Sequence, residues 1–187
     1  LVQAARQLAD RHAMPGRTSD ADQQVPLYKD FAAISGLLDR SHRRFREEDT
    51  STQSVSYAAE WLLDNYYSIQ QALREIKQDL PPGYYATLPR LDADDLFGGY
   101  PRIYAVAAAM VWEAGYQLDK ESIVRFALAY QVRQPLDSGE LWALPSFIRF
   151  VLLENLRRIS SRVERSRKMR FKANEVADEL IRLNDPE

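Results

Sequence analysis

Cysteine is absent from the 187 residues of this sequence, and histidine occurs only at His12 and His42. Without thiols, the chain has no disulfides, no thiolate metal sites and no cysteine nucleophile. A zinc site built on imidazole would need both histidines, yet they fall in separate predicted helices without ligand spacing. We therefore predict that both histidines lie on the surface and that the chain holds no metal and no cofactor.

Long apolar runs and an excess of one charge are also missing. No run approaches the ~18 residues that a bilayer span requires. The 25 Lys and Arg residues nearly balance the 27 Asp and Glu residues, so no overall field favours nucleic acid. Leu1 opens the chain, and no charged-then-apolar signal region follows. We expect a soluble piece of a longer protein with no nucleic-acid partner.

Glycine is scarce, at 7 residues, and the 9 prolines gather at junctions, as is typical of long helices with short connections. No run of alternating β-branched residues predicts a strand. No helix-pair signature recurs as a tandem repeat. The sequence therefore predicts an all-α fold, an irregular bundle of about six helices with a long C-terminal helix.

Capping residues and prolines bound the six predicted helices. These helices span, in order, residues 1–13, 26–49, 55–78, 101–115, 119–134 and 137–184. The clearest is 55–78, where apolar residues at three- and four-residue steps form a core face: Tyr57, Trp61, Leu62, Tyr66, Ile69, Leu73 and Ile76.

Two features mark the last helix. Asp137 followed by Glu140 forms a capping box at its start. The stretch 141–153 is apolar on nearly all sides, so we expect it to be the central buried segment, kinked or broken at Pro145.

The connections divide the chain into three predicted parts. Residues 17–24 read as a linker, 50–53 as a weak loop before the Ser54 cap, and 84–100 as an ordered loop. The parts are N-terminal helices with flexible linkers (1–53), a helical core (54–160) and a charged extension of the last helix (161–187).

Glu60 and Asp64 lie four residues apart and therefore on one side of the 55–78 helix. Paired carboxylates are the groups that glycoside hydrolysis uses. Trp61, Asn65 and Tyr66 are interleaved with them, as in a sugar-binding platform or at the edge of a core. Acid pairs at this spacing are common on solvated helix faces, and we prefer that structural interpretation.

Asp92 and Asp94 have the Asp-x-Asp spacing with which many glycosyltransferases hold a metal ion and a diphosphate. Such a site normally follows a strand, and no strand is predicted here. An acidic loop before a helix explains these residues without a ligand.

Arg149, Glu154 and Asn155 interrupt the most apolar helix. A buried charge without a partner costs several kcal/mol, so we expect a polar network. The expected partners are Glu60, Asp64 or Arg102, in a structural role that fixes helix register.

Two further patterns point to ligands. Tyr84, Tyr85 and Tyr100 gather in the predicted loop, where aromatic faces could stack on sugars or simply pack over the core. The tract from Arg157 to Lys172 is strongly basic and could meet an anionic membrane, although a solvated helix face is the simpler explanation.

Six motifs occur in a fixed order along the middle of the chain. They are AEWLLDNYY from Ala59, DLPPGYY from Asp79, GYPRIYA from Gly99, AYQ from Ala129, GELWALP from Gly139 and LENLRR from Leu153. Together they resemble the N-terminal region of cyclic β-1,2-glucan synthases, over roughly Ser56 to Ile159. Asp137-Ser138 departs from the Thr-Ile common in that family, a change that keeps the helix cap. The segments outside this span show no recognisable similarity.

The resemblance implies a parent protein of the bacterial inner membrane that polymerises glucose from UDP-glucose. Its glucosyltransferase domain, membrane helices and phosphorylase-like domain would lie downstream, and no catalytic residue of the family maps onto this chain. We therefore expect a non-catalytic helical module on the cytoplasmic face that docks on downstream domains of the synthase or regulates it. The alternative is a glycan-binding domain that holds the growing β-1,2-glucan chain, and a third possibility is an enzyme using Glu60 and Asp64.

The predicted docking or glycan surface combines the aromatic residues with the polar residues near them, centred on Glu60, Trp142 and Asn155. Its members are Glu60, Trp61, Asp64, Asn65, Tyr66, Tyr84, Tyr85, Arg102, Glu140, Trp142, Arg149 and Asn155.

Overall fold

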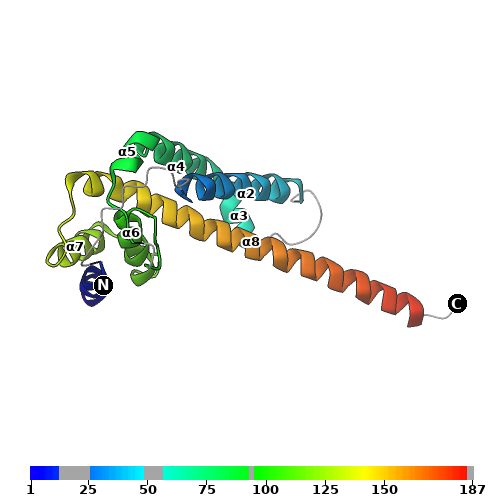
Figure 1. The fold of residues 1–187 in the computed structure, drawn as a ribbon. Helices are drawn as coiled ribbons and strands as arrows, with labels where there is room; N and C mark the ends of the chain where they lie inside the picture. The colour runs from blue at the N-terminus through cyan, green and yellow to red at the C-terminus, as the bar shows by residue number, and fades with distance from the viewer. Residues whose placement is uncertain (13–25, 49–56, 93–94, 185–187) are drawn as a thin grey trace.

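The computed structural model describes residues 1–12, 26–48, 57–92 and 95–184. Within these ranges the chain forms eight helices and no strand. In order they are α1 (Val2–Arg11), α2 (Pro26–Glu48), α3 (Tyr57–Asp64), α4 (Tyr66–Asp79), α5 (Pro82–Thr87), α6 (Arg102–Glu113), α7 (Lys120–Gln131) and α8 (Ser138–Asn184). The all-α fold and the long C-terminal helix are confirmed (Figure 1).

Helix α8 is the axis of the molecule. Its 47 residues correspond to a length of about 70 Å. Helices α2, α3, α4 and α6 pack on its N-terminal part, while α1 packs against α6 and α7. The C-terminal part continues away from the bundle (Figure 1). No helix in the described ranges combines the length and apolarity needed to cross a membrane.

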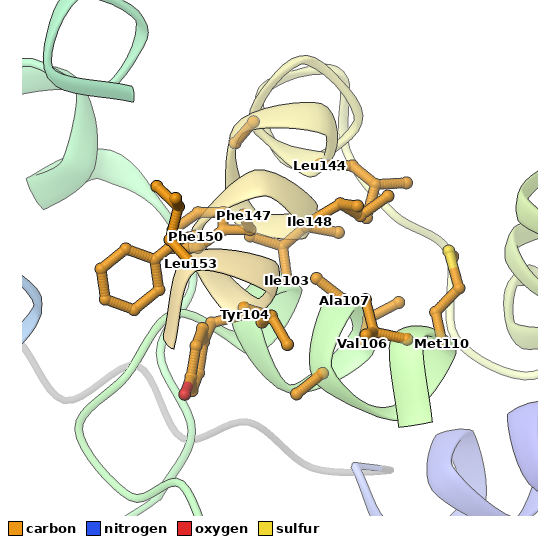
Figure 2. Close-up of a cluster of buried hydrophobic side chains, with 14 of the residues drawn as sticks. Ile103, Tyr104, Val106, Ala107, Met110, Leu144, Phe147, Ile148, Phe150 and Leu153 are labelled. Carbon is orange, nitrogen blue, oxygen red and sulfur yellow. The ribbon is translucent and has the colours of Figure 1, made fainter. Parts of the chain in front are cut away.

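The centre of the core lies where α6 crosses the start of α8 (Figure 2). All side chains from Arg102 to Ala108 are buried, because the alanines of α6 let its neighbours approach closely. The Tyr104 ring meets Phe147 and Phe150 in T-shaped contacts at about 6 Å. The most enclosed helix is therefore α6. The prediction for 141–153 is confirmed in part, since Phe147, Phe150 and Leu153 are buried, whereas Leu141, Trp142 and Leu152 are exposed.

Two short-range features account for eight helices where six were predicted. The 55–78 helix is interrupted at Asn65, whose side-chain amide and backbone N–H both donate to the Trp61 carbonyl, at 2.8 and 3.0 Å. Helix α5 lies at the start of the predicted loop, with Pro82 in its first turn, and is too short to show a periodicity. Pro145 does not end α8.

The predicted linker at 17–24 and loop at 50–53 lie outside the described residues, and the domain boundaries at 53 and 160 stay a prediction. Within the described ranges, α1 and α2 contribute Ala5, Leu8, Leu27 and Ile34 to the same core as α6 and α8.

His12 was predicted to lie on the surface, and this prediction was wrong. The residue is 3% exposed at the end of α1, and its Nδ1 lies 2.8 Å from the Tyr130 hydroxyl of α7. Burial lowers the pKa of His12 to about 4, against an opposing effect of the Asp95 carboxylate, whose Oδ2 lies 3.9 Å from Nε2. The neutral imidazole is thus part of the contact between α1 and α7.

This burial makes folding stability depend on pH. The unfolded chain protonates His12 below about pH 6.5, whereas the folded chain does so only near pH 4, so acid favours unfolding between these values. We expect His12→Gln to remove roughly 2 to 3 kcal/mol of the stability change between pH 7 and 4.5, as measured by urea unfolding. His42→Gln, at a half-exposed position, is the control and should keep most of the slope. Parallel profiles for the wild type and His12→Gln would contradict the assignment.

Candidate functional site

An open apolar groove lies between α3 and α4 on one side and α8 on the other, and we call it the Trp61 groove. It has a volume of about 530 Å³. Residues from α3 and α4 that line it include Tyr57, Trp61 and Ile69, and residues from α8 include Leu152, Leu156 and Ile159. Contiguous exposed apolar surface is a candidate for contact with another segment or ligand.

Exposure of the α3 aromatics corrects the predicted core face of 55–78. Tyr57 and Trp61 were expected inside, but Trp61 is 43% exposed and Tyr57 more so. Leu62, Ile69, Leu73 and Ile76 do enter the core. The break at Asn65 separates the two helices, so a single apolar stripe no longer faces one direction.

A second hollow of about 500 Å³ lies near the start of α8, and we call it the Trp142 pocket. Trp142 is 82% exposed there. Tyr84 lines the same pocket and donates a hydrogen bond to the Gly139 carbonyl. Burial, and next the Asp137 carboxylate, raise the pKa of Tyr84, so its hydroxyl is neutral at physiological pH. The pocket therefore combines an open aromatic face with a phenol.

Arg149 lines both hollows. Its Nε lies 3.2 Å from a Glu75 carboxylate oxygen, and its Nη1 lies 3.9 Å from Oδ2 of Asp79. The Ser146 hydroxyl donates to the same Asp79 oxygen at 2.8 Å. The predicted partners of Arg149 were therefore wrong, because the acids of α4 face α8 here. The spacing of Glu75 and Asp79, four residues apart, was the signal that sequence reasoning missed.

The predicted cluster around Glu60, Trp142 and Asn155 does not form. Trp142 and Asn155 are 13 residues apart on α8, which separates them by about 20 Å. Asn155 lines the Trp61 groove with Asn65, whereas Trp142 lines the other pocket. Glu60 and Asp64 are exposed on α3 and line neither hollow.

Two tyrosines of the predicted docking or glycan surface, Tyr66 and Tyr85, make contacts within the bundle instead. Tyr66 donates a hydrogen bond to Asp39 of α2, and its ring stacks on His42 at 3.6 Å. Tyr85 is buried in the core, and burial raises its pKa. Neither residue lines the Trp61 groove or the Trp142 pocket.

Arg102 and Glu140 form a buried ion pair that joins α6 to α8. Glu140 is fully buried, and its two oxygens lie 2.8 and 2.5 Å from Nε and Nη2 of Arg102. Nη2 also donates to the Pro135 carbonyl at 3.0 Å. Burial opposes the charge on Arg102, but the hydrogen bonds and the charge of Glu140 outweigh it and raise the pKa of Arg102.

The same Glu140 closes the predicted capping box of α8. Its backbone N–H donates to Asp137 Oδ1 at 2.7 Å, and the Asp137 N–H donates back to Glu140 Oε2 at 3.0 Å. The cap is confirmed, and the carboxylate has the additional partner Arg102, which sequence spacing did not indicate.

The acidic loop is only partly described, since residues 93–94 lie outside the described ranges. Asp95 accepts a hydrogen bond from the Phe97 N–H at 2.9 Å and faces His12. Among the residues that the structure describes, no three metal-ligating side chains gather closely enough to hold an ion.

Comparison of the sequence with those of known proteins identifies a relative of this chain. The chain is 47% identical over 148 residues, 79% of its length, to the cyclic beta-(1,2)-glucan synthase NdvB of Rhizobium meliloti strain 1021. The chain is similar to part of a cyclic β-(1,2)-glucan synthase. It spans 5% of that protein's length. No protein-family model matches the chain.

The relationship predicted from the six motifs is confirmed by this similarity to the synthase. The match is longer than the span from Ser56 to Ile159 over which the motifs were recognised. It therefore extends into at least one of the flanking segments for which no similarity was expected.

The contribution of the buried ion pair to the packing of α6 on α8 can be tested by substitution. We expect Glu140→Ala to reduce the free energy of unfolding by about 3 to 5 kcal/mol, because Arg102 is left buried and unpaired. The double variant Arg102→Met with Glu140→Met should recover most of this loss. Urea unfolding of the wild type and these two variants measures the loss and its recovery.

Arg158→Ala is the control, because it breaks the exposed pair with Glu154 and should cost less than about 1 kcal/mol. An equal loss for Glu140→Ala and Arg158→Ala would show that the buried pair is not the anchor of this helix crossing.

Proposed function

We propose that this chain is a non-catalytic helical module of a cyclic β-1,2-glucan synthase, and that the Trp61 groove receives another segment of the same synthase. The parent protein would make cyclic glucan from UDP-glucose, with this module on the cytoplasmic face of the inner membrane. The observation that carries the docking role is the groove itself, in which Trp61, Leu152 and Ile159 are exposed together.

The composition of the groove supports a protein occupant. Its surface is mainly aliphatic and aromatic, with amide side chains from Asn65 and Asn155 and one cation, Arg149, which is already paired with acids of α4. A few polar groups within an apolar surface are typical of the core of a protein interface. The chain spans 5% of its relative, so most of such a synthase is available as the source of the docked segment.

The arrangement of the acids supports a role other than glycoside chemistry. Such chemistry needs two carboxyl groups about 5 to 10 Å apart across a cleft that admits the sugar. Glu60 and Asp64 share one exposed helix face and line neither hollow.

Docking through the groove is tested in the full-length synthase with a photo-crosslinking amino acid at position 61. We expect irradiation to join position 61 to a peptide from another part of the synthase. Position 128 is the matched control, because Leu128 is an exposed apolar residue of α7, away from the groove. Leu152→Glu should abolish the crosslink from position 61 and lower glucan synthesis by membranes several-fold, whereas Leu128→Glu should change neither.

The docking proposal fails if position 61 crosslinks no better than position 128. It also fails if Leu152→Glu leaves both the crosslink and glucan synthesis intact. Thermal unfolding of the 187-residue chain carrying each substitution separates a docking defect from a folding defect.

A second candidate function, glycan binding, rests on the Trp142 pocket. Trp142 offers an open ring face of the kind that stacks on pyranose rings, next to the Tyr84 phenol. Asp79, Ser146 and Arg149 line the same pocket and supply hydrogen-bonding groups. An apolar platform with a few polar groups is the usual composition of a small-ligand site.

The two functions are separated by titrating the isotope-labelled chain with linear and cyclic β-1,2-glucan while following the tryptophan indole signals. Glycan binding predicts saturable shifts at Trp142 with smaller changes at Trp61, and Trp142→Ala should abolish binding. Trp112→Ala is the control, since Trp112 is exposed on α6 and lines neither the pocket nor the groove. Unchanged spectra at millimolar glycan would exclude this function and leave docking.

A further inference from the structure

The C-terminal part of α8 leaves the bundle at Arg167. The last contacts with α2 are the Ser41 hydroxyl donating to Glu164 at 2.6 Å, the pair of Arg44 with Glu164, and the Arg167 guanidinium over the Phe45 ring. From residue 168 to residue 182 every side chain is exposed. We call residues 168–184 the α8 tail, a helix of about 25 Å that points away from the molecule (Figure 1).

The sequence of the tail does not suit a helix that stays alone in water. Isolated helices of this length are marginal unless a partner covers an apolar face. Met169, Ala173, Val176 and Leu180 follow one another at steps of four, three and four residues, which is the spacing of a coiled-coil seam. Met169 is 64% and Leu180 is 62% exposed. We therefore expect a second helix to pack against this seam.

The charges of the tail indicate which helix fits. Its first part is basic, with Lys168, Arg170 and Lys172, and its second part is acidic, with Glu175, Asp178 and Glu179. A parallel copy would bring like charges together, whereas an antiparallel copy brings each basic part against an acidic part. We infer that the α8 tail pairs antiparallel with the tail of a second copy of this chain. This homodimer contact is independent of the docking role proposed for the Trp61 groove.

The seam permits one satisfactory register. When Met169 faces Leu180 of the second copy, Ala173 faces its Val176, and all four layers are apolar. In the same register the flanking Lys172 faces Glu179 of the second copy, and by symmetry this pair occurs twice.

Shifting the pairing by one heptad is unfavourable in either direction. One shift places Arg162 against Leu180 and the two Lys172 side chains against each other. The opposite shift brings the two Glu179 side chains together. The first shift would also pair Arg165 with Glu179, but it places the polar Arg162 and Ser166 in the seam. Like charges face each other in both shifts, so the register above is favoured.

The bundle leaves room for this partner. In the chosen register the overlap ends near residue 166, which is where α2 begins to cover α8 through Ser41 and Phe45. The two bundles therefore lie at opposite ends of the paired tails. A seam of this length is small for a protein interface, so we expect a weak, concentration-dependent dimer.

Absence of native cysteine makes crosslinking a direct test of the geometry. Ala173→Cys and Val176→Cys chains mixed in equal amounts should form a mixed disulfide faster than either chain forms one with itself, because residue 173 faces residue 176 across the antiparallel seam. A parallel pair would join like positions, so faster self-crosslinking of each variant would overturn the proposal.

Sedimentation equilibrium of the uncrosslinked 187-residue chain tests the energetics. We expect Leu180→Asp to weaken dimerisation at least about tenfold. The control Phe171→Asp, which changes an exposed apolar residue on the opposite side of the tail, should alter it less than about threefold. Lys172→Glu should weaken the dimer, and the added Glu179→Lys should restore it, since the swap recreates the opposite-charge pair.

Two sedimentation results would also overturn the proposal. The first is a wild-type chain that stays monomeric at several hundred micromolar while circular dichroism shows the tail to be helical. The second is an equal effect of Leu180→Asp and Phe171→Asp. If the monomeric chain instead sediments with phosphatidylglycerol vesicles and loses this with Lys168→Glu and Arg170→Glu, the tail faces anionic lipid and the dimer is rejected.

Discussion

The crossing of α6 and α8 depends on one buried ion pair, Arg102 with Glu140. Taking both charges out of water is costly, and the cost is offset only where every donor and acceptor has a partner. Glu140 meets this condition by binding Arg102 while it also accepts the N–H of Asp137 at the start of α8. Because one carboxylate serves both the helix cap and the helix crossing, it fixes where α8 begins and which side of it faces α6. The aromatic contacts of Tyr104 with Phe147 and Phe150 follow from that placement.

The N-terminal end of α8 is anchored by this pair. The length of the rest of α8 determines how much of its surface the other helices can cover. The helix is far longer than the bundle packed on it, so α3 and α4 cover it incompletely and α2 leaves it at Arg167. Two apolar surfaces result, the Trp61 groove and the seam of the α8 tail. Both are more apolar than the Trp142 pocket, where the exposed tryptophan ring lies beside the Asp79 carboxylate and the Ser146 hydroxyl. These two surfaces are the basis of the docking and pairing proposed for this chain.

Local signals in the sequence predicted the helices well. Pro101, the Asp119 cap and Gly115 with its positive φ mark real helix ends, because each acts through its own backbone. The interruption at Asn65 was missed because the periodicity of the apolar residues continues across it, and the side-chain bond from Asn65 to Trp61 leaves no trace in that spacing. The site was predicted less well. Trp61, Asn65 and Asn155 do line one groove. Trp142 lies closer to the start of α8 and lines the Trp142 pocket instead.

The sequence by itself determined the all-α class, the capping box of α8 and the resemblance to a cyclic β-1,2-glucan synthase, since helix ends and ordered motifs are properties of neighbouring residues. Only the tertiary structure decided which apolar residues are buried, because burial depends on the helices that arrive from elsewhere in the chain. His12 is enclosed by α7, Arg149 finds its acids on α4, and Trp61 stays open because no described helix covers the groove beside α8. Pairings between distant segments follow from how far each helix extends and where it crosses the next, and no local spacing encodes that geometry.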